Sequence, residues 1–417
     1  MTKNNIAICG AALIDGTGSE LVAGSTVVVE NDCITAVGPA ETVTVPEGAR
    51  RIDAAGKFLL PGLIELHSHA YHPAMVPTEV QEPEAYAVLY AVHCLRQALQ
   101  AGITTVREVC QMAYMDLAVK RAVNEGLVPG PRLYASGKGI CMTGGHGSDL
   151  EGFMIEADGV HEIVKAIREQ KKRGVDLIKI LTSHRDETPE YTQEEIDIAV
   201  RESHRLGLRV AVHAASRLVT DMVVKAGVDT VEHGTFVSGD TAKRMADQGT
   251  FWVPTCYVIC RIGEFAEKAL QSGMPFPPNI ERELMLSKEW GEKCTAALPD
   301  AFEKILKAGV RIGAGTDAIG RDMVYASLPE EMEHLVQFGC TPLQAIESAT
   351  RIGAEAIGVE SKIGTIETGK LADMIMVDRD PLADITAVKS VTWVMKGGRE
   401  VPFEKAYDRL SGKTPWA

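Results

Sequence analysis

Two histidines separated by a single serine close an apolar run at residues 59–71, which reads LLPGLIELHSHAY. In a strand, residues i and i+2 point to the same face, so His67 and His69 are expected on one side. Neutral imidazole is a ligand for divalent transition metals such as zinc. The His-x-His pair alone is weak evidence, because structural histidines at this spacing are more common than ligands. A metal site requires further ligands elsewhere in the chain.

Four more side chains with suitable chemistry lie late in other apolar runs. Lys179 lies in DLIKILTS, His213 in RVAVHAA, His233 in TVEHGTF, and Asp317 ends RIGAGTD. A buried lysine is costly unless it is paired or chemically changed. If the five strands converge, four imidazoles, a lysine and a carboxylate predict one metal site.

Each of these residues also has a structural interpretation. His213 or His233 alone would more often be a hydrogen-bonded core histidine. Asp317 can be a helix N-cap, and Lys179 can extend its ammonium to solvent. The joint pattern favours a site, because random placement seldom puts these residues at the ends of five different strands.

The elements that would position these residues alternate between short apolar runs and amphipathic segments. The segment VHEIVKAIREQKKRG predicts a helix that stops at Gly174, and Thr192 with Glu195 forms a capping box for a helix that closes at Gly207. The alternation predicts an α/β fold, a (β/α)8 TIM barrel, although a doubly wound sheet has the same rhythm. In barrel enzymes the chemistry lies at the carboxyl ends of the strands. The eight candidate strands are GLIELHSH, ITTVREV, RLYASG, DLIKILTS, RVAVHAA, TVEHGTF, TFWVPTCY and RIGAGTD.

The two ends of the chain differ from the middle. Short β-rich runs between Gly, Asn and Asp turn signals occupy the first and last sixty residues. We predict that residues 1–58 and 360–417 form one small composite β-sandwich domain, and that residues 59–359 form the inserted barrel. Residues 261–309, broken by PFPP, are expected to be mostly helical and to cover the barrel mouth or an interface.

The composition excludes several classes of protein. The net charge is −14, and no basic cluster is dense enough to indicate nucleic-acid binding. No apolar run approaches a membrane-spanning length, and the start has no signal-peptide pattern. Nine cysteines without a framework spacing indicate packed thiols in a reducing compartment rather than disulfides. We therefore predict a cytoplasmic protein that binds neither nucleic acid nor a membrane.

Several of these motifs together resemble the amidohydrolase superfamily over nearly the whole chain. PGLIELHSH resembles its Pro-Gly-Leu-Ile-Asp-x-His-x-His strand, with Glu65 where Asp is usual, and GTD at 315–317 resembles its last-strand motif. TPLQAIESATRIGAEAIG and GTIETGKLADMIMVD resemble its closing segments. The sequence is most similar to the branch of imidazolonepropionase-like proteins and metal-dependent dipeptidases acting on Xaa-Pro or Xaa-Arg substrates. The family also implies the split β-sandwich.

The resemblance implies a binuclear centre of two divalent metal ions, most often Zn²⁺. Carbon dioxide would carboxylate the Lys179 amine, and the carbamate would bridge both metals. This modification explains a lysine in an apolar strand, since the carbamate is anionic and metal-bound. His67, His69 and Asp317 would bind the first metal, and His213 and His233 the second.

The implied mechanism is attack by a metal-bridging hydroxide on an amide carbonyl. Asp317 would take the water proton and pass it to the leaving nitrogen. His146, in TGGHG, and Tyr257, expected at the end of the seventh strand in VPTCY, would hydrogen-bond the carbonyl oxygen. Alternatively, His146 caps a loop and Tyr257 packs. His184 and Arg185, after the fourth strand, either bind a substrate carboxylate or belong to a solvated loop.

A small-molecule amide substrate is expected only from this resemblance, and the leading functional hypothesis is hydrolysis of an amide bond in a dipeptide or an N-acyl amino acid. Hydrolysis of a cyclic amide, aryl amide, urea, carbamate or phosphoester at the same site remains an alternative. Deaminase chemistry is disfavoured, because deaminases of this fold typically lack the lysine of the fourth strand. A catalytically silent binding protein is disfavoured by the complete ligand set. A homo-oligomer is expected only because oligomers are common for this fold.

Overall fold

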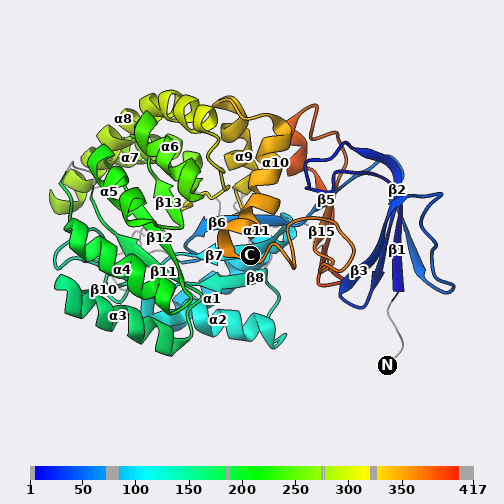
Figure 1. Ribbon diagram of the computed structural model, residues 1–417, viewed down its shortest axis with the longest axis horizontal. Helices are drawn as coiled ribbons and strands as arrows, with labels where there is room; N and C mark the ends of the chain where they lie inside the picture. Colours follow the sequence, from blue (N-terminus) through cyan, green and yellow to red (C-terminus); the bar gives the residue numbers. More distant parts are fainter. Residues whose placement is uncertain are drawn as a thin grey trace.

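The computed structural model describes residues 5–71, 84–184, 188–273, 276, 278–319 and 326–402 (Figure 1). Helices and parallel strands alternate through the middle of the chain, and strands from its two ends lie to one side. The α/β class predicted from the sequence is therefore confirmed.

Strands from both ends of the chain form one eight-stranded sheet in the order β17-β16-β15-β5-β1-β2-β3, with β4 paired to β1. Alternating apolar residues of these strands, such as Ile6 and Ile8, pack with Met374 and Met395 in a core of their own. The strands are β1 (Asn5–Leu13), β2 (Val22–Glu30), β3 (Cys33–Pro39), β4 (Arg50–Asp53), β5 (Phe58–Pro61), β15 (Met374–Val377), β16 (Val391–Lys396) and β17 (Arg399–Glu400).

The strands of the middle segment pair in parallel in two sheets, β6-β7-β8 and β10-β9-β11-β12-β13-β14. Most of their residues are buried on both faces, which explains why the sequence shows continuous apolar runs. The strands are β6 (Leu63–Ser68), β7 (Ile103–Glu108), β8 (Arg132–Ala135), β9 (Gly139–Cys141), β10 (Met154–Glu156), β11 (Leu177–Leu181), β12 (Arg209–Ala214), β13 (Thr230–His233) and β14 (Phe251–Val253).

The third predicted strand is shorter than expected and is followed by a break. β8 ends at Ala135, and Gly137 adopts a φ of 66° before β9 begins. Gln170 fills the break with its side-chain amide, which donates to the carbonyls of Ser136 and Lys138. The kink lets β8 pair with β7 and β9 pair with β11.

The prediction that RIGAGTD forms a regular eighth strand is wrong. Residues 311–317 form only an isolated bridge, between Trp252 and Ile312, although backbone hydrogen bonds join them to Trp252 on one side and to Leu66 and His67 on the other. Gly313 and Gly315 allow this close approach, since a Cβ on either would meet Leu66 or Val253 at 2.4 and 2.6 Å.

The predicted helices are confirmed with their ends. α3 stops at Gly174, which has a φ of 89°, and both hydrogen bonds of the Thr192–Glu195 capping box precede α4. The helices are α1 (Glu84–Gln100), α2 (Met115–Asn124), α3 (Gly159–Arg173), α4 (Gln193–Arg205), α5 (Arg217–Ala226), α6 (Gly239–Gln248), α7 (Cys256–Gln271), α8 (Pro278–Ala308), α9 (Leu328–Gln337), α10 (Pro342–Ser348) and α11 (Arg351–Ile357).

The segment expected to be helical between residues 261 and 309 contains most of α7 and the whole of α8. The two helices approach closely at Gly263 and Gly291, where a Cβ on Gly291 would lie 2.9 Å from the backbone nitrogen of Gly263. Among the described residues, none of the helices is both long and apolar enough to cross a membrane.

Candidate metal centre

The carboxyl ends of the parallel strands surround a cavity of about 220 Å³. β6 contributes the His-x-His pair, β11, β12 and β13 contribute one residue each, and the segment after β14 contributes the aspartate. The structure thus brings eight residues singled out from the sequence to one place. They are His67, His69, His146, Lys179, His184, His213, His233 and Asp317.

Three imidazoles approach the Asp317 carboxylate. The distances from Nε2 to the nearest carboxylate oxygen are 3.3 Å for His69, 3.7 Å for His67 and 4.0 Å for His233. Ligand atoms of His67, His233 and Asp317 all lie within 4.8 Å of one another. This compact group can hold a metal ion with two nitrogens and one oxygen.

Hydrogen bonds at Nδ1 indicate which nitrogen of each imidazole faces the carboxylate unprotonated. His67 Nδ1 lies 2.7 Å from Glu232, and His69 Nδ1 lies 3.1 Å from the carbonyl of Cys110. His233 Nδ1 lies 2.7 Å from the Thr255 hydroxyl, whose own proton goes to the carbonyl of Pro254. All three acceptors require a proton on Nδ1, so this network assigns a lone pair to each Nε2.

The pKa values of two of these imidazoles, His67 and His233, agree with this assignment. Burial lowers the pKa of His67 to about 3 and that of His233 to about 4. Burial alone would raise the pKa of Asp317, and imidazoles that carry a proton at His67 and His69 would lower it. Neutral nitrogens therefore face an anionic carboxylate, an arrangement that a divalent cation between them would stabilise.

Lys179 and His213 complete the donor set. Lys179 is 3% exposed, burial lowers its pKa, and it has no hydrogen bond or ion pair with any residue that the structure describes. The ring of His213 lies 4.5 Å from that of His233, and burial keeps its pKa well below the ordinary value. A neutral imidazole and a lysine without a counter-ion fit a second metal and a carboxylated bridging amine.

Strained backbone accompanies these side chains. The φ angles are 66° at His233, 50° at Asp317, 53° at Thr255 and 110° at Cys110, all outside the regions that non-glycine residues prefer. These residues end strands or follow them directly beside the cavity. Such strain persists where the surrounding structure fixes it, and it concentrates at functional sites.

Glu65, which stands where the related motif has aspartate, joins the two motifs that carry the site. Its Oε1 accepts the backbone N–H of His67 at 2.8 Å and that of Thr316 at 2.9 Å. The carboxylate thereby fixes the His-x-His strand against the GTD segment.

Two charged residues of the site were missed by the sequence reasoning. Glu232, which holds His67, is fully buried, and its Oε1 accepts from Arg107 Nη2 at 2.7 Å. Burial favours a raised pKa for Glu232, but Arg107 and His67 keep it below its usual range. Both lie in apolar strands, in VREV and TVEH, so the argument applied to Lys179 could have found them.

His146 and His184 line the cavity together. The backbone N–H of His146 donates to Glu190 at 2.9 Å, and its ring lies 4.5 Å from His213 and 4.9 Å from His184. Arg185 lies outside the described residues.

The expected position of Tyr257 is wrong. β14 ends at Val253, the left-handed conformation of Thr255 turns the chain, and Tyr257 lies buried in the first turn of α7. Its backbone N–H donates to Glu331, and Tyr257 is not among the described residues that line the cavity.

Apolar side chains make up most of the remaining wall. Trp290 of α8, which the sequence reasoning missed, lies edge-on to His233 at 6.5 Å between ring centroids. The wall thus presents an apolar surface directly beside the polar centre. Its other large members are Leu150, Phe153, Leu181, Val258 and Ile262.

Comparisons with known proteins agree with this geometry. Residues 58–401 match the model of the amidohydrolase family. The chain is 28% identical to ochratoxinase from Aspergillus niger over 94% of this chain and 85% of that protein. It is 24% identical to imidazolonepropionase from Pseudomonas aeruginosa, over 90% and 93% of the two chains.

A solved structure of an Xaa-Pro dipeptidase with bound methionine in its active site is also similar. It superposes with a TM-score of 0.84 and 28% identity, over 95% of this chain and 99% of that one. The protein described here belongs to the amidohydrolase family and is a hydrolase that acts on carbon–nitrogen bonds.

Proposed function

We propose that the protein is a binuclear metal-dependent amidohydrolase that cleaves the amide bond of a dipeptide or an N-acyl amino acid. The observation that carries this proposal is the convergence of three Nε2 lone pairs on the anionic carboxylate of Asp317. The similarity to an Xaa-Pro dipeptidase supports the choice of substrate class.

In this proposal His67, His69 and Asp317 hold one metal ion, and His213 and His233 hold the other. Carboxylation would give the buried Lys179 amine a negative charge and metal partners, where it has no partner among the described residues. Two bound Zn²⁺ ions would supply the Lewis acidity that activates water and polarises the scissile carbonyl.

The protein's own groups then handle protons and orientation. Asp317 accepts a proton on its carboxylate and delivers it to the leaving nitrogen. His146 donates to the substrate carbonyl oxygen from a position beside His213. Tyr257 takes the same role only if the first turn of α7 rearranges. His184 and Arg185 bind a substrate carboxylate.

The apolar wall favours a substrate with a hydrophobic group next to the scissile bond. Trp290, Phe153 and Ile262 exclude water from one side of the cavity and offer contact area to such a group. This wall also supports the second candidate function, hydrolysis of an aryl amide, and the relation to imidazolonepropionase supports a cyclic amide. Ureas, carbamates and phosphoesters remain alternatives at the same metals.

The architecture belongs to the same proposal. We infer that residues 59–359 form a closed (β/α)8 barrel, supported by the backbone hydrogen bonds that join residues 311–317 to both β14 and β6. Residues 1–58 and 360–417 would form the composite β-sandwich domain. A cytoplasmic location and a homo-oligomer stay predictions.

Amine release from a mixed library of L,L-dipeptides and N-acyl-L-amino acids tests the proposal. The zinc-loaded protein is compared with Asp317→Asn, which should keep the fold and lose turnover. Release that the variant lacks supports amide hydrolysis and identifies the preferred side chain. Silence across the library, with metal bound, would reject the dipeptide and N-acyl substrates and favour the alternatives.

A further inference from the structure

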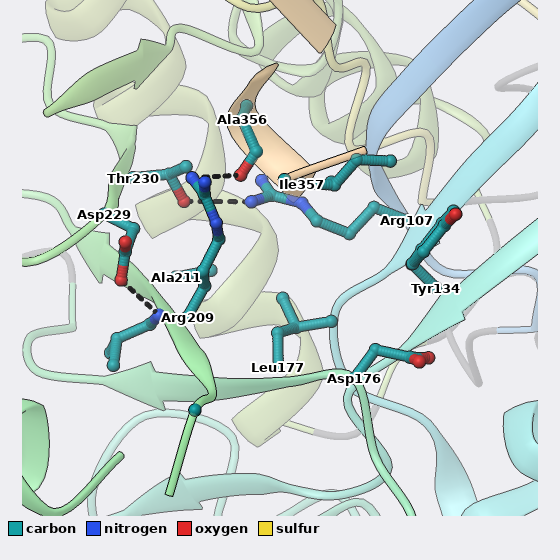
Figure 2. Close-up of a pocket in the computed structure, with 13 residues that line it drawn as sticks. Arg107, Tyr134, Asp176, Leu177, Arg209, Ala211, Asp229, Thr230, Ala356 and Ile357 are labelled. Atoms are coloured by element: carbon teal, nitrogen blue, oxygen red, sulfur yellow. Dashed lines mark hydrogen bonds between the residues drawn. The ribbon is translucent and has the colours of Figure 1, made fainter. Parts of the chain in front are cut away.

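A second cavity lies at the opposite, amino-terminal ends of the parallel strands (Figure 2). This cavity, called the lower cavity below, has a volume of about 240 Å³. Its wall includes the residues that begin β12 and β13, Arg209 and Thr230, and the end of α11 at Ala356 and Ile357. Figure 2 shows the guanidinium groups of Arg107 and Arg209 directed toward each other across this space.

Arg107 is the buried cation of the lower cavity, with a side chain only 2% exposed. It donates to the carbonyl of Leu66, to the Thr230 hydroxyl at 3.0 Å and to Glu232 at 2.7 Å. A guanidinium has five N–H groups, so these three hydrogen bonds leave two for another acceptor.

Arg209 is less well satisfied. Its one hydrogen bond is from Nη1 to the carbonyl of Ala356 at 3.2 Å, at the end of α11. It forms no ion pair with any residue in the described ranges, so its charge faces the cavity without a counter-anion. The remaining N–H groups of the half-buried Arg209 have no acceptor among the described residues.

The two carboxylates in the wall are already engaged. Asp176 pairs with Lys120 at 2.6 Å and accepts the backbone N–H of Ala135. Asp229 accepts the backbone N–H of Val210 at 2.8 Å and contacts His204 at 2.7 Å. Neither has an ion pair with Arg209, so the Arg209 guanidinium keeps donors for another acceptor in the cavity.

We propose that the lower cavity binds a small oxyanion, a carboxylate or inorganic phosphate, between Arg107 and Arg209. Planar guanidinium groups match the oxygen spacing of both anions, and two of them on opposite walls can hold one anion from two sides. A cavity of this volume has room for such an anion and its water.

The anion would also influence the metal centre. Arg107 contacts Glu232 at 2.7 Å, and Glu232 contacts His67 Nδ1 at 2.7 Å, so one chain of hydrogen bonds joins the two cavities. An anion bound to Arg107 offsets part of the positive charge that Arg107 otherwise directs at Glu232. Glu232 then becomes a stronger hydrogen-bond acceptor for His67. Metal affinity therefore rises when the anion binds, and the reverse holds by thermodynamic linkage.

Isothermal titration of the purified protein with inorganic phosphate and, separately, with acetate tests the site. Arg209→Gln should weaken binding by about tenfold or more, in line with the loss of a charge-assisted hydrogen bond. Arg201→Gln, which removes the same charge from an exposed position on α4, should bind as the parent does. Response to phosphate alone or to acetate alone identifies which anion the site takes.

Three results would overturn the proposal: no binding of either anion, equal affinity in the two arginine variants, or binding that disappears when the metal is removed. The third result would place the anion at the metal centre instead. If Arg209→Gln lowers the melting temperature because α11 loses its contact, Arg209→Lys, which keeps the charge, should bind with intermediate affinity.

The coupling has its own readout in the zinc affinity, measured by competition with a chelator. Saturating anion should tighten zinc binding by roughly fivefold in the parent, and Arg209→Gln should need about tenfold more anion to reach the same effect. Anion binding without this change would remove the coupling and keep the site. The anion titration does not depend on turnover, so its failure is distinct from failure of the proposed hydrolase.

Discussion

At the carboxyl ends of the parallel strands, Asp317 faces the unprotonated nitrogens of three imidazoles. At the amino ends, Asp229 receives a backbone N–H from Val210 and contacts His204. Asp317 follows β14 and Asp229 precedes β13, so both carboxylates lie at ends of the parallel strands. Imidazole lone pairs face Asp317, whereas hydrogen-bond donors face Asp229. The same contrast holds for the buried cations, since Lys179 has no partner among the described residues whereas Arg107 has three.

The difference separates groups held for chemistry from groups held for stability. A buried polar group without a partner costs free energy. Imidazole lone pairs and a buried lysine gathered around Asp317 therefore indicate a ligand-binding site at the carboxyl ends of the strands. The strained φ angles of His233 and Asp317 lie at that same end. In the lower cavity Arg209 is half-buried, with one hydrogen bond and no ion pair among the described residues, which is why we infer a ligand there as well.

Replacement of Asp317, at the carboxyl ends of the strands, should have the largest effect on activity. We expect Asp317→Asn to reduce kcat by about a thousandfold, because the amide cannot accept the proton. In metal-free protein its melting temperature should not fall, since the lost carboxylate faces lone pairs rather than donors. Steady-state kinetics and thermal unfolding measure both quantities, and near-parent turnover would remove the proton-transfer role.

Replacement of Glu232, which links the metal centre to the lower cavity, should have an intermediate effect. Glu232→Gln should weaken metal binding by about 10- to 100-fold, because the neutral amide no longer holds His67 Nδ1–H as strongly. Glu331→Gln is the matched control. Glu331 is also fully buried, but its carboxylate accepts the backbone N–H groups of Cys256 and Tyr257. Chelator competition on both variants decides, and equal metal affinity would make Glu232 purely structural.

The same aspartate-to-asparagine exchange at Asp229, at the amino ends of the strands, tests the difference between the two ends. Asp229→Asn should lower the free energy of unfolding by about 1 kcal/mol, through loss of charge-assisted hydrogen bonds, and leave kcat unchanged. Denaturant titration and kinetics on one preparation provide the test. A large loss of turnover in this variant would erase the distinction between the two ends.

Tyr257→Phe should have only a small effect on turnover. The hydroxyl lies on a residue buried in the first turn of α7, outside the described wall of the cavity, so we expect kcat to fall by less than about tenfold. A fall of several hundredfold would show that the turn rearranges around substrate and would restore the oxyanion role.

The placement of these residues at one end of the strands could be predicted from the sequence because its signal is local. His67 and His69 share a strand face by period, and Lys179, His213 and His233 each interrupt an apolar run, so their common direction follows once the strands are parallel. The capping box before α4 and the glycine after α3 are equally local, and the structure has both.

What the sequence did not predict depends on contacts between distant segments. The role of Glu232 becomes visible only when β13 brings it to His67 of β6, 165 residues away in the chain. The irregular eighth segment follows from the packing of Gly313 and Gly315 against Leu66 and Val253. Tyr257 was misplaced because the left-handed turn at Thr255, a β-branched residue, contradicts its local preference.

The most direct test of the account is the metal content of protein purified with zinc, measured by elemental mass spectrometry for the parent and Lys179→Ala. The account predicts about two zinc ions per chain in the parent, a loss in the variant, and partial recovery of metal and turnover with a short carboxylic acid. A parent without zinc, or a variant that keeps the full content, would contradict the binuclear centre on which the proposed hydrolysis depends.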